Sequence, residues 1–486
     1  MDQPIIGFAQ SYTDIKILFD STNKYLNTEI YVCGWIKRFR TTGKKSLAFV
    51  HLSDGSCLDH LQIVFDPKNL TDDSIISRGV VGMSIKVKGK FVESLGKKQS
   101  FEVLASEYII LGDIIEPETY PLAGYSTTLA GFRSLPHLRT KDDTFSSIAR
   151  IKSKLRSSST EFFDSLGFVE VQIPLITDNE CESGAHPFTV TTILDGLTED
   201  GKVVATKDFD HDFFRKRTYL TVSGQLHLEG LMGGLSKVWT MTTAFRAEPS
   251  FGPLHVAEFW MLELEFAFST LEDNIKVNES YIKFCITKIL QTCPKELEFL
   301  QSKYNSKLIS MLQKYATVPF IISSHAECVK LMLDDVANQK VKFEVMPRYD
   351  DDLTKEHEMY ITEKLFDSSP VFVRYYPAKI KSFYMPKIDP GSDIEHVDCF
   401  DLLFPKFGEI VGGSQREHNY AKLLARMDES GVKKETMKFY IDMRKYGSVP
   451  HGGSGIGIDR LLMIITGMDN IRDMIPYPRS YQTSLF

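Results

Sequence analysis

A stretch of alternating apolar and charged residues at positions 243–265 constrains the fold of this chain more than any other segment. It reads T-A-F-R-A-E-P-S-F-G-P-L-H-V-A-E-F-W-M-L-E-L-E. The runs 239–245 and 258–266 alternate as β-strands do, and the segment between them, which contains Pro and Gly, is typical of a long loop. The sequence therefore predicts two antiparallel strands joined by this loop.

Charged and aromatic side chains are concentrated on this predicted hairpin, among them Arg246, Glu248, His255, Phe259 and Glu263. A buried pair of strands does not tolerate so many charges unless they serve a ligand. A guanidinium, an aromatic ring and carboxylates on one sheet face would suit a nucleotide, because the ring can cover the base and the Arg can bind phosphate. The alternative is an amphipathic hairpin whose charged face is solvated.

Length and composition indicate a globular protein with more than one domain. The chain has 486 residues, of which 43% are hydrophobic and 25% charged. No apolar run approaches the roughly 20 residues of a membrane span, and residues 1–8 show no targeting pattern. The seven cysteines form no C-x-x-C pair. We therefore expect reduced thiols, no zinc site, no membrane association and a cytoplasmic location.

The N-terminal part predicts a small β-barrel of the oligonucleotide-binding kind. Phe49 and Gln62 alternate with core positions on central strands, so a ring and an amide could face outward together; the alternative places Phe49 in the core. The net charge is −7, but residues 1–112 hold 14 Lys and Arg against 12 Asp and Glu, so a polyanion would meet this part first. The expected strands are 29–39, 47–52, 60–65, 83–91 and 101–110.

The rest of the chain predicts a connector followed by a larger domain. Segment 113–143 is polar and interrupted by Pro, which is typical of a linker or hinge. A helix is expected at about 144–165, a strand at 168–173, and further helices at about 271–312 and 354–366. We therefore expect a barrel domain at 1–112, a linker at 113–143 and a second domain at 144–486.

Further candidate ligand-binding residues occur in short motifs. A glycine-rich run, P-H-G-G-S-G-I-G-I-D-R, ends at Arg460 and lets a ligand approach the backbone closely. Residues 400–417 include Asp401 and Glu409, carboxylates that suit Mg²⁺ beside a nucleotide phosphate. Earlier motifs are C-E-S-G-A at 181–185 and S-G-Q-L-H-L-E at 223–229. Taken singly, such carboxylates are more often solvated surface groups.

Together and in this order, these motifs resemble the class II aminoacyl-tRNA synthetases, in particular the subgroup of aspartyl and asparaginyl enzymes. The resemblance covers about residues 28–486 and rests on G-F-V-E-V-Q-I-P, S-G-Q-L-H-L-E, F-R-A-E, E-F-W-M-L-E, G-E-I-V-G-G-S-Q-R-E and G-I-G-I-D-R. It implies an α+β fold with an antiparallel-sheet catalytic domain and an N-terminal OB-fold barrel that binds the anticodon.

The resemblance implies an ATP site and a Mg²⁺ site at matching positions. Arg246 would hold the α-phosphate and stabilise charge as an acyl adenylate forms, and Arg460 would cover the base and hold the γ-phosphate, so these two are the implied catalytic residues. Phe259 would stack on the adenine. Asp401 and Glu409 would bind Mg²⁺. The implied ATP site comprises Arg246, Glu248, His255, Phe259, Glu409, Gly457 and Arg460.

Two positions of the implied amino-acid site favour asparagine over aspartate. Aspartyl enzymes have Lys where this chain has Leu228 and Asp where it has Glu263. Leu228 cannot pair with a second carboxylate oxygen, whereas Glu263 can accept a hydrogen bond from an amide and would repel aspartate. Arg416 would bind the side-chain oxygen in either case. The implied asparagine site comprises Glu182, Ser223, Gln225, Leu228, Glu263 and Arg416.

The implied partners are L-asparagine, ATP and tRNA(Asn), with Arg40, Phe49 and Gln62 in the barrel at positions that bind the anticodon. Segment 167–174 resembles a dimer-forming strand, so a homodimer is expected. Asp459 resembles the aspartyl enzymes instead, and Leu254 stands where asparaginyl enzymes commonly have Arg. The alternatives are therefore an aspartyl or non-discriminating ligase, a relative that makes asparagine itself but lacks the barrel, and a non-catalytic RNA-binding paralogue.

Overall fold

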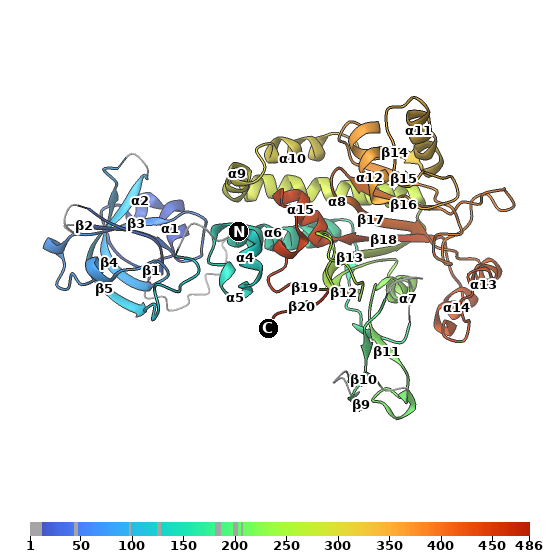
Figure 1. The fold of residues 1–486 in the computed structure, drawn as a ribbon, viewed down its shortest axis with the longest axis horizontal. Coiled ribbons are helices and arrows are strands. Elements are labelled where there is room, and N and C mark those ends of the chain that lie inside the picture. Colours follow the sequence, from blue (N-terminus) through green and yellow to red (C-terminus); the bar gives the residue numbers. More distant parts are fainter. Residues whose placement is uncertain are drawn as a thin grey trace. The chain divides into compact units, whose positions relative to one another are not determined.

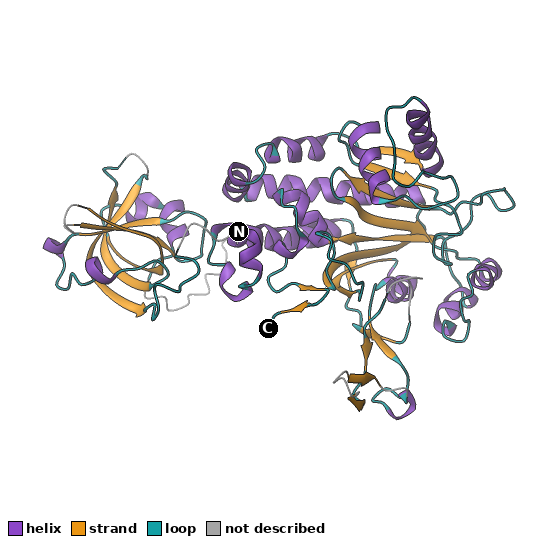
Figure 2. Cartoon of the chain, viewed as in Figure 1, coloured by secondary structure: helices purple, strands orange, loops and turns teal. Residues whose placement is uncertain are grey.

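The computed structural model of the chain describes residues 12–42, 47–96, 99–123, 128–179, 186–197, 203–205 and 208–486. Contacts along the chain divide it into two compact units, Met1–Ser147 and Ile148–Phe486. Figure 1 traces the elements of both units, and Figure 2 shows a strand-rich first unit and a second unit of mixed helices and strands. Within the described ranges, no helix combines the length and apolar character that crossing a membrane requires.

The first unit is built around a closed β-barrel with the strand order β1-β2-β3-β5-β4 (Figure 1). Strands β3 and β5 pair in parallel, and the other neighbours are antiparallel. Alternate side chains such as Val32, Val50 and Ile63 fill the interior. The five predicted strands are confirmed, with small differences at their ends: β1 (Glu29–Thr42), β2 (Leu47–Ser53), β3 (Leu61–Phe65), β4 (Ser84–Glu93) and β5 (Phe101–Gly112).

Short helices accompany the barrel, and two of them lie in the segment predicted as a linker. Pro136 interrupts that segment in the sequence but begins a helix in the structure, since the first helical position needs no backbone N–H donor. The helices of this unit are α1 (Ile15–Asp20), α2 (Thr22–Tyr25), α3 (Ile75–Arg78), α4 (Leu129–Arg133) and α5 (Pro136–Arg139).

An eight-stranded sheet forms the centre of the second unit, with the order β14-β15-β16-β17-β18-β13-β12-β6. The six strands from β15 to β12 in this order pair antiparallel, while β14–β15 and β12–β6 are parallel pairs. The strands are β6 (Val169–Glu170), β12 (Lys237–Phe245), β13 (Glu258–Ala267), β14 (Ile321–Ser324), β15 (Val371–Arg374), β16 (Cys399–Phe404), β17 (Gly408–Gln415) and β18 (His451–Gly457).

The predicted hairpin at 239–266 is confirmed as β12 and β13, which pair continuously from Lys237 opposite Phe266 to Phe245 opposite Glu258. The predicted strand at 168–173 is shorter than expected, because only β6 pairs with β12. Among the described residues between 194 and 220 lie three short strands, β9 (Leu194–Leu197), β10 (Val203–Ala205) and β11 (Thr218–Leu220).

Helices cover one face of this sheet (Figure 2). Helix α6 (Asp143–Ser165) places Phe163 against Trp239 of β12, with ring centroids 5.0 Å apart. From α8 (Leu271–Thr292), the Asn278 side chain donates to Ser454 Oγ of β18 at 2.9 Å. Because side chains alternate along a strand, the neighbouring positions of β18 face away from α8. The opposite sheet face carries α7 (Gln225–Leu235) over part of β12 and β13, and the rest of that face can carry a polar site.

The remaining helices of the second unit lie around the sheet (Figure 1). The helices predicted at 271–312 and 354–366 are confirmed, and the second continues from α12 into one wide helical turn at Ile361–Leu365. These elements are α7 (Gln225–Leu235), α9 (Pro294–Lys303), α10 (Leu308–Thr317), α11 (His325–Ala337), α12 (Lys355–Tyr360), α13 (Tyr420–Glu429), α14 (Lys438–Lys445) and α15 (Ile458–Thr466).

Candidate active site

The sheet face opposite α8 is lined by charged side chains from β13 and by glycines of β18, and α7 packs over part of it. Glu263 and Glu265 of β13 pair with Gly455 and Gly453 of β18. A Cβ atom at Gly453 would overlap the Glu265 carboxylate, and one at Gly455 would lie 2.8 Å from the Met261 methyl carbon. The glycines therefore make room for the acidic and apolar side chains of the next strand.

Arg246 and Phe259 meet at the end of the β12–β13 hairpin. The Arg246 guanidinium lies 5.4 Å from the centre of the Phe259 ring, and its positive charge also acts on the Glu263 carboxylate. The two residues are brought together because Ala257 accepts a hydrogen bond from the Arg246 amide, which extends the pairing of the strands. A flat ring beside a guanidinium can bind a base next to a phosphate.

His255 and Arg460 lie close together at the same end of the sheet. Burial and the charge of Arg460 lower the pKa of His255, while Glu248 opposes them. Arg460 donates to the backbone oxygen of Glu409 at 2.9 Å. Gly457 precedes α15 and provides no side-chain cap, so the first-turn amides of this helix remain suited to an anion.

Asp401 and Glu409 border one space beside Gly412. A Cβ atom at Gly412 would lie 3.7 Å from Asp401 Oδ1 and 3.0 Å from Glu409 Oε1. Lys381 donates to the other Asp401 oxygen at 2.7 Å. Burial raises the pKa of Asp401 to about 6, with Lys381 opposing and Glu409 reinforcing this change. Two carboxylates that repel one another in this way can be stabilised by a divalent cation.

Ser223 of the S-G-Q-L-H-L-E motif lies beside Glu263, and Gln225 contacts Ser223. The Ser223 hydroxyl donates to Glu263 Oε1 at 2.5 Å, and the Gly224 amide donates to Glu263 Oε2 at 2.9 Å. The backbone N–H of Gln225 donates to Ser223 Oγ at 3.2 Å. Burial raises the pKa of Glu263. The structure thus brings these three predicted residues together.

Arg416 is buried under the same face and is held by two side chains. Its Nε and Nη2 donate to the Glu265 carboxylate at 3.0–3.3 Å, and Nη1 donates to Ser414 Oγ at 2.5 Å. Its guanidinium carbon also lies 5.3 Å from the centre of the Tyr384 ring. These contacts fix the plane of the guanidinium, so one edge can be directed at a planar amide or carboxylate.

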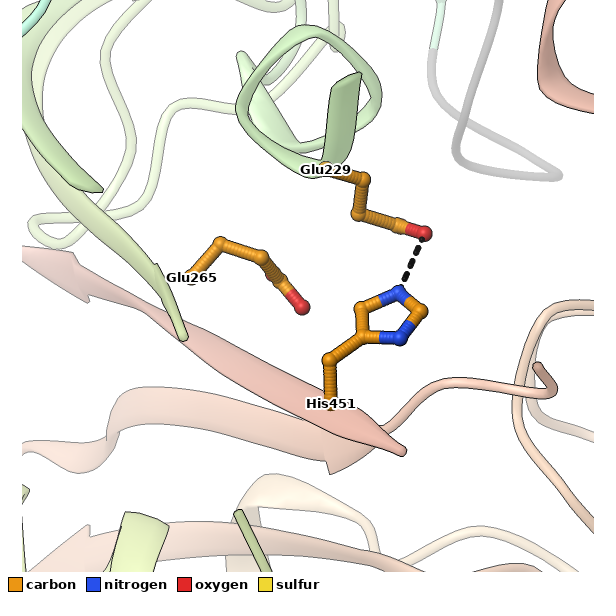
Figure 3. Close-up of side chains that lie close together, drawn as sticks. All are labelled: Glu229, Glu265 and His451. Carbon is orange, nitrogen blue, oxygen red and sulfur yellow. Dashed lines mark hydrogen bonds and ion pairs between the residues drawn. The ribbon is translucent and has the colours of Figure 1, made fainter. Parts of the chain in front are cut away.

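Sequence reasoning assigned no role to Glu229, which ends the same motif. Figure 3 shows Glu229, Glu265 and His451 converging, with His451 Nε2 3.1 Å from Glu229 Oε2. Their ligand atoms lie within 4.8 Å of one another, a spacing that could hold a metal ion. Arg444 and Arg416 already pair with the two carboxylates, which satisfies these groups without a metal.

Three other sequence expectations are affected by the structure. Leu228 packs in an apolar cluster with Met232 and Val238, so its contact with a substrate stays a prediction. Glu182 lies outside the described residues. Asp459, which resembled the aspartyl enzymes, is buried and accepts hydrogen bonds from the Lys152 ammonium at 2.6 Å and the Trp260 amide at 2.9 Å. These bonds give Asp459 a structural role.

In the barrel, Arg40 and Phe49 are paired across β1 and β2, and the Arg40 guanidinium lies 4.9 Å from the ring centre. Phe49 is half-buried. Gln62 is only 3% exposed, and its amide donates to Glu102 at 2.6 Å. Gln62 alternates with the core residues Leu61 and Ile63, as expected, but it is covered and not solvent-exposed, because Glu102 on the neighbouring strand engages it. Contact with an RNA base would require this bond to open.

Comparison with known families agrees with this architecture. The family described as tRNA synthetases class II (D, K and N) matches residues 133–481, and an OB-fold nucleic acid binding domain matches residues 30–111. The fold and the site together therefore define a class II aminoacyl-tRNA synthetase with an N-terminal OB-fold barrel, as the sequence predicted.

Individual relatives narrow the assignment. An asparagine–tRNA ligase from Porphyromonas gingivalis is 41% identical and spans 94% of this chain and 96% of its own length. Another asparagine–tRNA ligase, from Acetivibrio thermocellus, is 40% identical, and the match spans 98% of this chain and 99% of that protein. The asparaginyl-tRNA synthetase from Pyrococcus horikoshii complexed with asparaginyl-adenylate has a TM-score of 0.81 at 29% identity, with 95% and 97% covered. The chain belongs to the asparagine–tRNA ligase family.

Proposed function

We propose that this enzyme activates L-asparagine with ATP to asparaginyl-adenylate and then transfers the asparaginyl group to the 3′-terminal adenosine of tRNA(Asn). The observation that carries this proposal is the joint placement of Arg246, Glu263 and Arg416 on one sheet face. A phosphate-binding cation thus lies beside a pocket with a fixed guanidinium and a carboxylate. The relatives' similarity over nearly the whole chain supports it.

The chain's own side chains act mainly by positioning and by charge neutralisation. The asparagine carboxylate attacks the α-phosphorus of ATP, and pyrophosphate leaves. Arg246 neutralises charge that develops on the α-phosphate, while Phe259 and Glu248 hold the adenine and Arg460 and His255 face the leaving pyrophosphate. No covalent bond to the protein is required.

In the amino-acid pocket, Arg416 directs its guanidinium edge at the side-chain amide oxygen, and Glu263 accepts from the amide nitrogen. Ser223, Gln225 and Glu182 bind the α-amino group. Leu228 leaves the pocket without a second cation, which favours a neutral side chain over a carboxylate.

Mg²⁺ fits the space between Asp401 and Glu409, since two hard oxygen ligands border it and their mutual repulsion would be relieved. When bound, the ion would neutralise charge on the ATP phosphates. Lys381 keeps Asp401 oriented toward this space. We propose in addition that the enzyme is cytoplasmic and that it forms a homodimer through segment 167–174.

The deciding measurement is ATP–pyrophosphate exchange with each amino acid in turn. We expect exchange with asparagine and none with aspartate, followed by asparagine transfer to tRNA(Asn). Exchange with aspartate alone would refute the proposed substrate, and tRNA binding without any exchange would indicate a non-catalytic RNA-binding protein.

Loss of a magnesium ligand should change the metal requirement of this exchange. We expect Asp401→Asn to raise the Mg²⁺ concentration for half-maximal exchange at least about tenfold, because a divalent cation loses one charged ligand. A titration of exchange rate against Mg²⁺ measures this. Asp393→Asn, which changes an exposed carboxylate, is the matched control; equal Mg²⁺ dependence in both variants would place the ion elsewhere.

The barrel should contribute to tRNA binding but not to activation. Stacking of a base on an aromatic ring contributes about 1–3 kcal/mol, so Phe49→Ala should raise the KM for tRNA(Asn) roughly 5–150-fold. Its asparagine-dependent exchange should stay unchanged. Tyr31→Ala removes another exposed ring of the barrel and should leave the KM unchanged; a similar rise in both variants would contradict a specific role for Phe49.

A further inference from the structure

Glu229 is a buried carboxylate that receives hydrogen bonds from four side chains. Arg444 Nη2 donates to it at 2.6 Å, the Tyr440 hydroxyl at 2.7 Å, and Gln225 Nε2 at 3.1 Å. The fourth donor is His451, at 3.1 Å (Figure 3). The Glu229 side chain is 1% exposed. So many donors around one carboxylate keep it charged and fixed in place.

The donors also determine which charges lie around Glu229. His451 Nδ1 lies 2.7 Å from the carbonyl oxygen of Val449, and Nε2 faces the Glu229 carboxylate. Both ring nitrogens therefore lie against oxygen atoms, and these contacts hold the imidazole in place. Burial alone would raise the pKa of Glu229, but Arg444, His451 and Arg416 hold it well below its usual range.

Glu229 is also close to the guanidinium that we assign to the substrate side chain. Its Oε1 atom lies 3.9 Å from Arg416 Nε, on the same guanidinium that pairs with Glu265. Without Glu229, the buried cations Arg416 and Arg444 would face Glu265 as the remaining carboxylate of this cluster. A pocket with that surplus of positive charge would attract a substrate carboxylate.

We propose that Glu229 is a specificity-determining residue, whose buried negative charge offsets the cations around Arg416 so that the pocket accepts the neutral side chain of asparagine and rejects that of aspartate. This rests on the proposed function, and it assigns to Glu229 a share of the discrimination that Leu228 and Glu263 were expected to provide. Glu229 acts through Arg416 and need not touch the substrate. Arg444 and Tyr440 of α14 are the residues that hold it.

The test is Glu229→Gln, which keeps the shape of the side chain and removes its charge. Asparagine-dependent exchange is measured together with inhibition of that exchange by L-aspartate. We expect the ratio of the aspartate inhibition constant to the asparagine KM to fall at least about tenfold. A purely structural defect would weaken both constants or lower kcat and leave this ratio unchanged. An unchanged ratio in a folded Glu229→Gln variant would overturn the inference.

Two further variants keep the test decisive. Glu229→Gln leaves Arg444 buried without its charged partner and could unfold the protein. Glu229→Gln with Arg444→Gln removes both charges, and its ratio should still fall at least about threefold, because Glu229 is the member of this pair that lies 3.9 Å from Arg416 Nε. Glu417→Gln alters another buried carboxylate, which accepts from the Asn419 amide, and should keep the wild-type ratio. A ratio unchanged in the double variant, or lowered equally in Glu417→Gln, contradicts the inference. Absence of asparagine exchange in the wild type overturns the proposed function as well.

Discussion

Replacement of Arg246 by alanine is expected to lower kcat for asparagine-dependent ATP–pyrophosphate exchange about 10³-fold. The guanidinium is held over Phe259 at the end of β12, where it would meet charge that grows on the α-phosphate as the carboxylate attacks. Removal of one preorganised hydrogen-bond donor to such a charge lowers kcat about 10²–10³-fold. The alanine variant also loses the full positive charge of the guanidinium. Steady-state exchange kinetics measure the effect, with the KM for ATP determined separately.

Two variants show whether the loss at Arg246 is specific. Arg246→Lys keeps the charge but not the planar pair of donors, so its kcat should fall between those of wild type and alanine variant. Arg374→Ala removes an arginine that pairs with Glu272 near the sheet edge and should leave kcat within about twofold of wild type. If Arg246→Ala raised only the KM for ATP, the residue would bind the ground state and transition state equally.

Replacement of Arg416 by lysine is expected to lower kcat/KM for asparagine about 10²-fold. The guanidinium donates to Glu265 and Ser414 through all three of its nitrogens, and the N–H groups left over can reach the substrate. A lysine ammonium has three donors and cannot reproduce this planar arrangement. Loss of a hydrogen bond to a charged group costs about 1.5–3 kcal/mol, and Glu265 would lose part of its partner as well.

The matched control for Arg416 is Arg426→Lys. Arg426 is also buried and pairs with Glu429 on α13, so the same substitution tests general damage from exchanging a buried arginine. Its kcat/KM for asparagine should remain near that of wild type. A loss confined to the KM for ATP in Arg416→Lys would show that this guanidinium does not serve the amino acid.

Local patterns were sufficient to predict the barrel strands and the central hairpin. In both, apolar and polar residues alternate within single strands, and this alternation depends only on neighbouring positions of the sequence. Local composition also indicated the character of single motifs, as for the glycine-rich strand β18 that precedes Arg460. Which residues share one sheet face then follows from strand pairing.

Contacts between distant segments were not predictable in this way. The burial of Gln62 was not predictable, because nothing in its own strand indicates Glu102, which lies 40 positions away and engages it. Asp459 similarly binds Lys152, 307 positions earlier. Glu229 was overlooked because its principal partner, Arg444, is 215 positions further along the chain. The sequence therefore predicted candidate site residues but not the network of contacts around Glu229.

The glycine-rich strand β18 has a consequence for the stability of the protein. A glycine within a strand lowers stability by roughly 0.5–1 kcal/mol relative to alanine, because it loses more backbone freedom on folding. At Gly453 this loss cannot be recovered by substitution, since a methyl group would occupy the space of the Glu265 carboxylate. Backbone hydrogen bonds to β13 on one side and to β17 on the other hold β18 in its extended conformation. At the base of the pocket, Gly453 therefore lowers the thermal stability of the protein but leaves space for the Glu265 carboxylate.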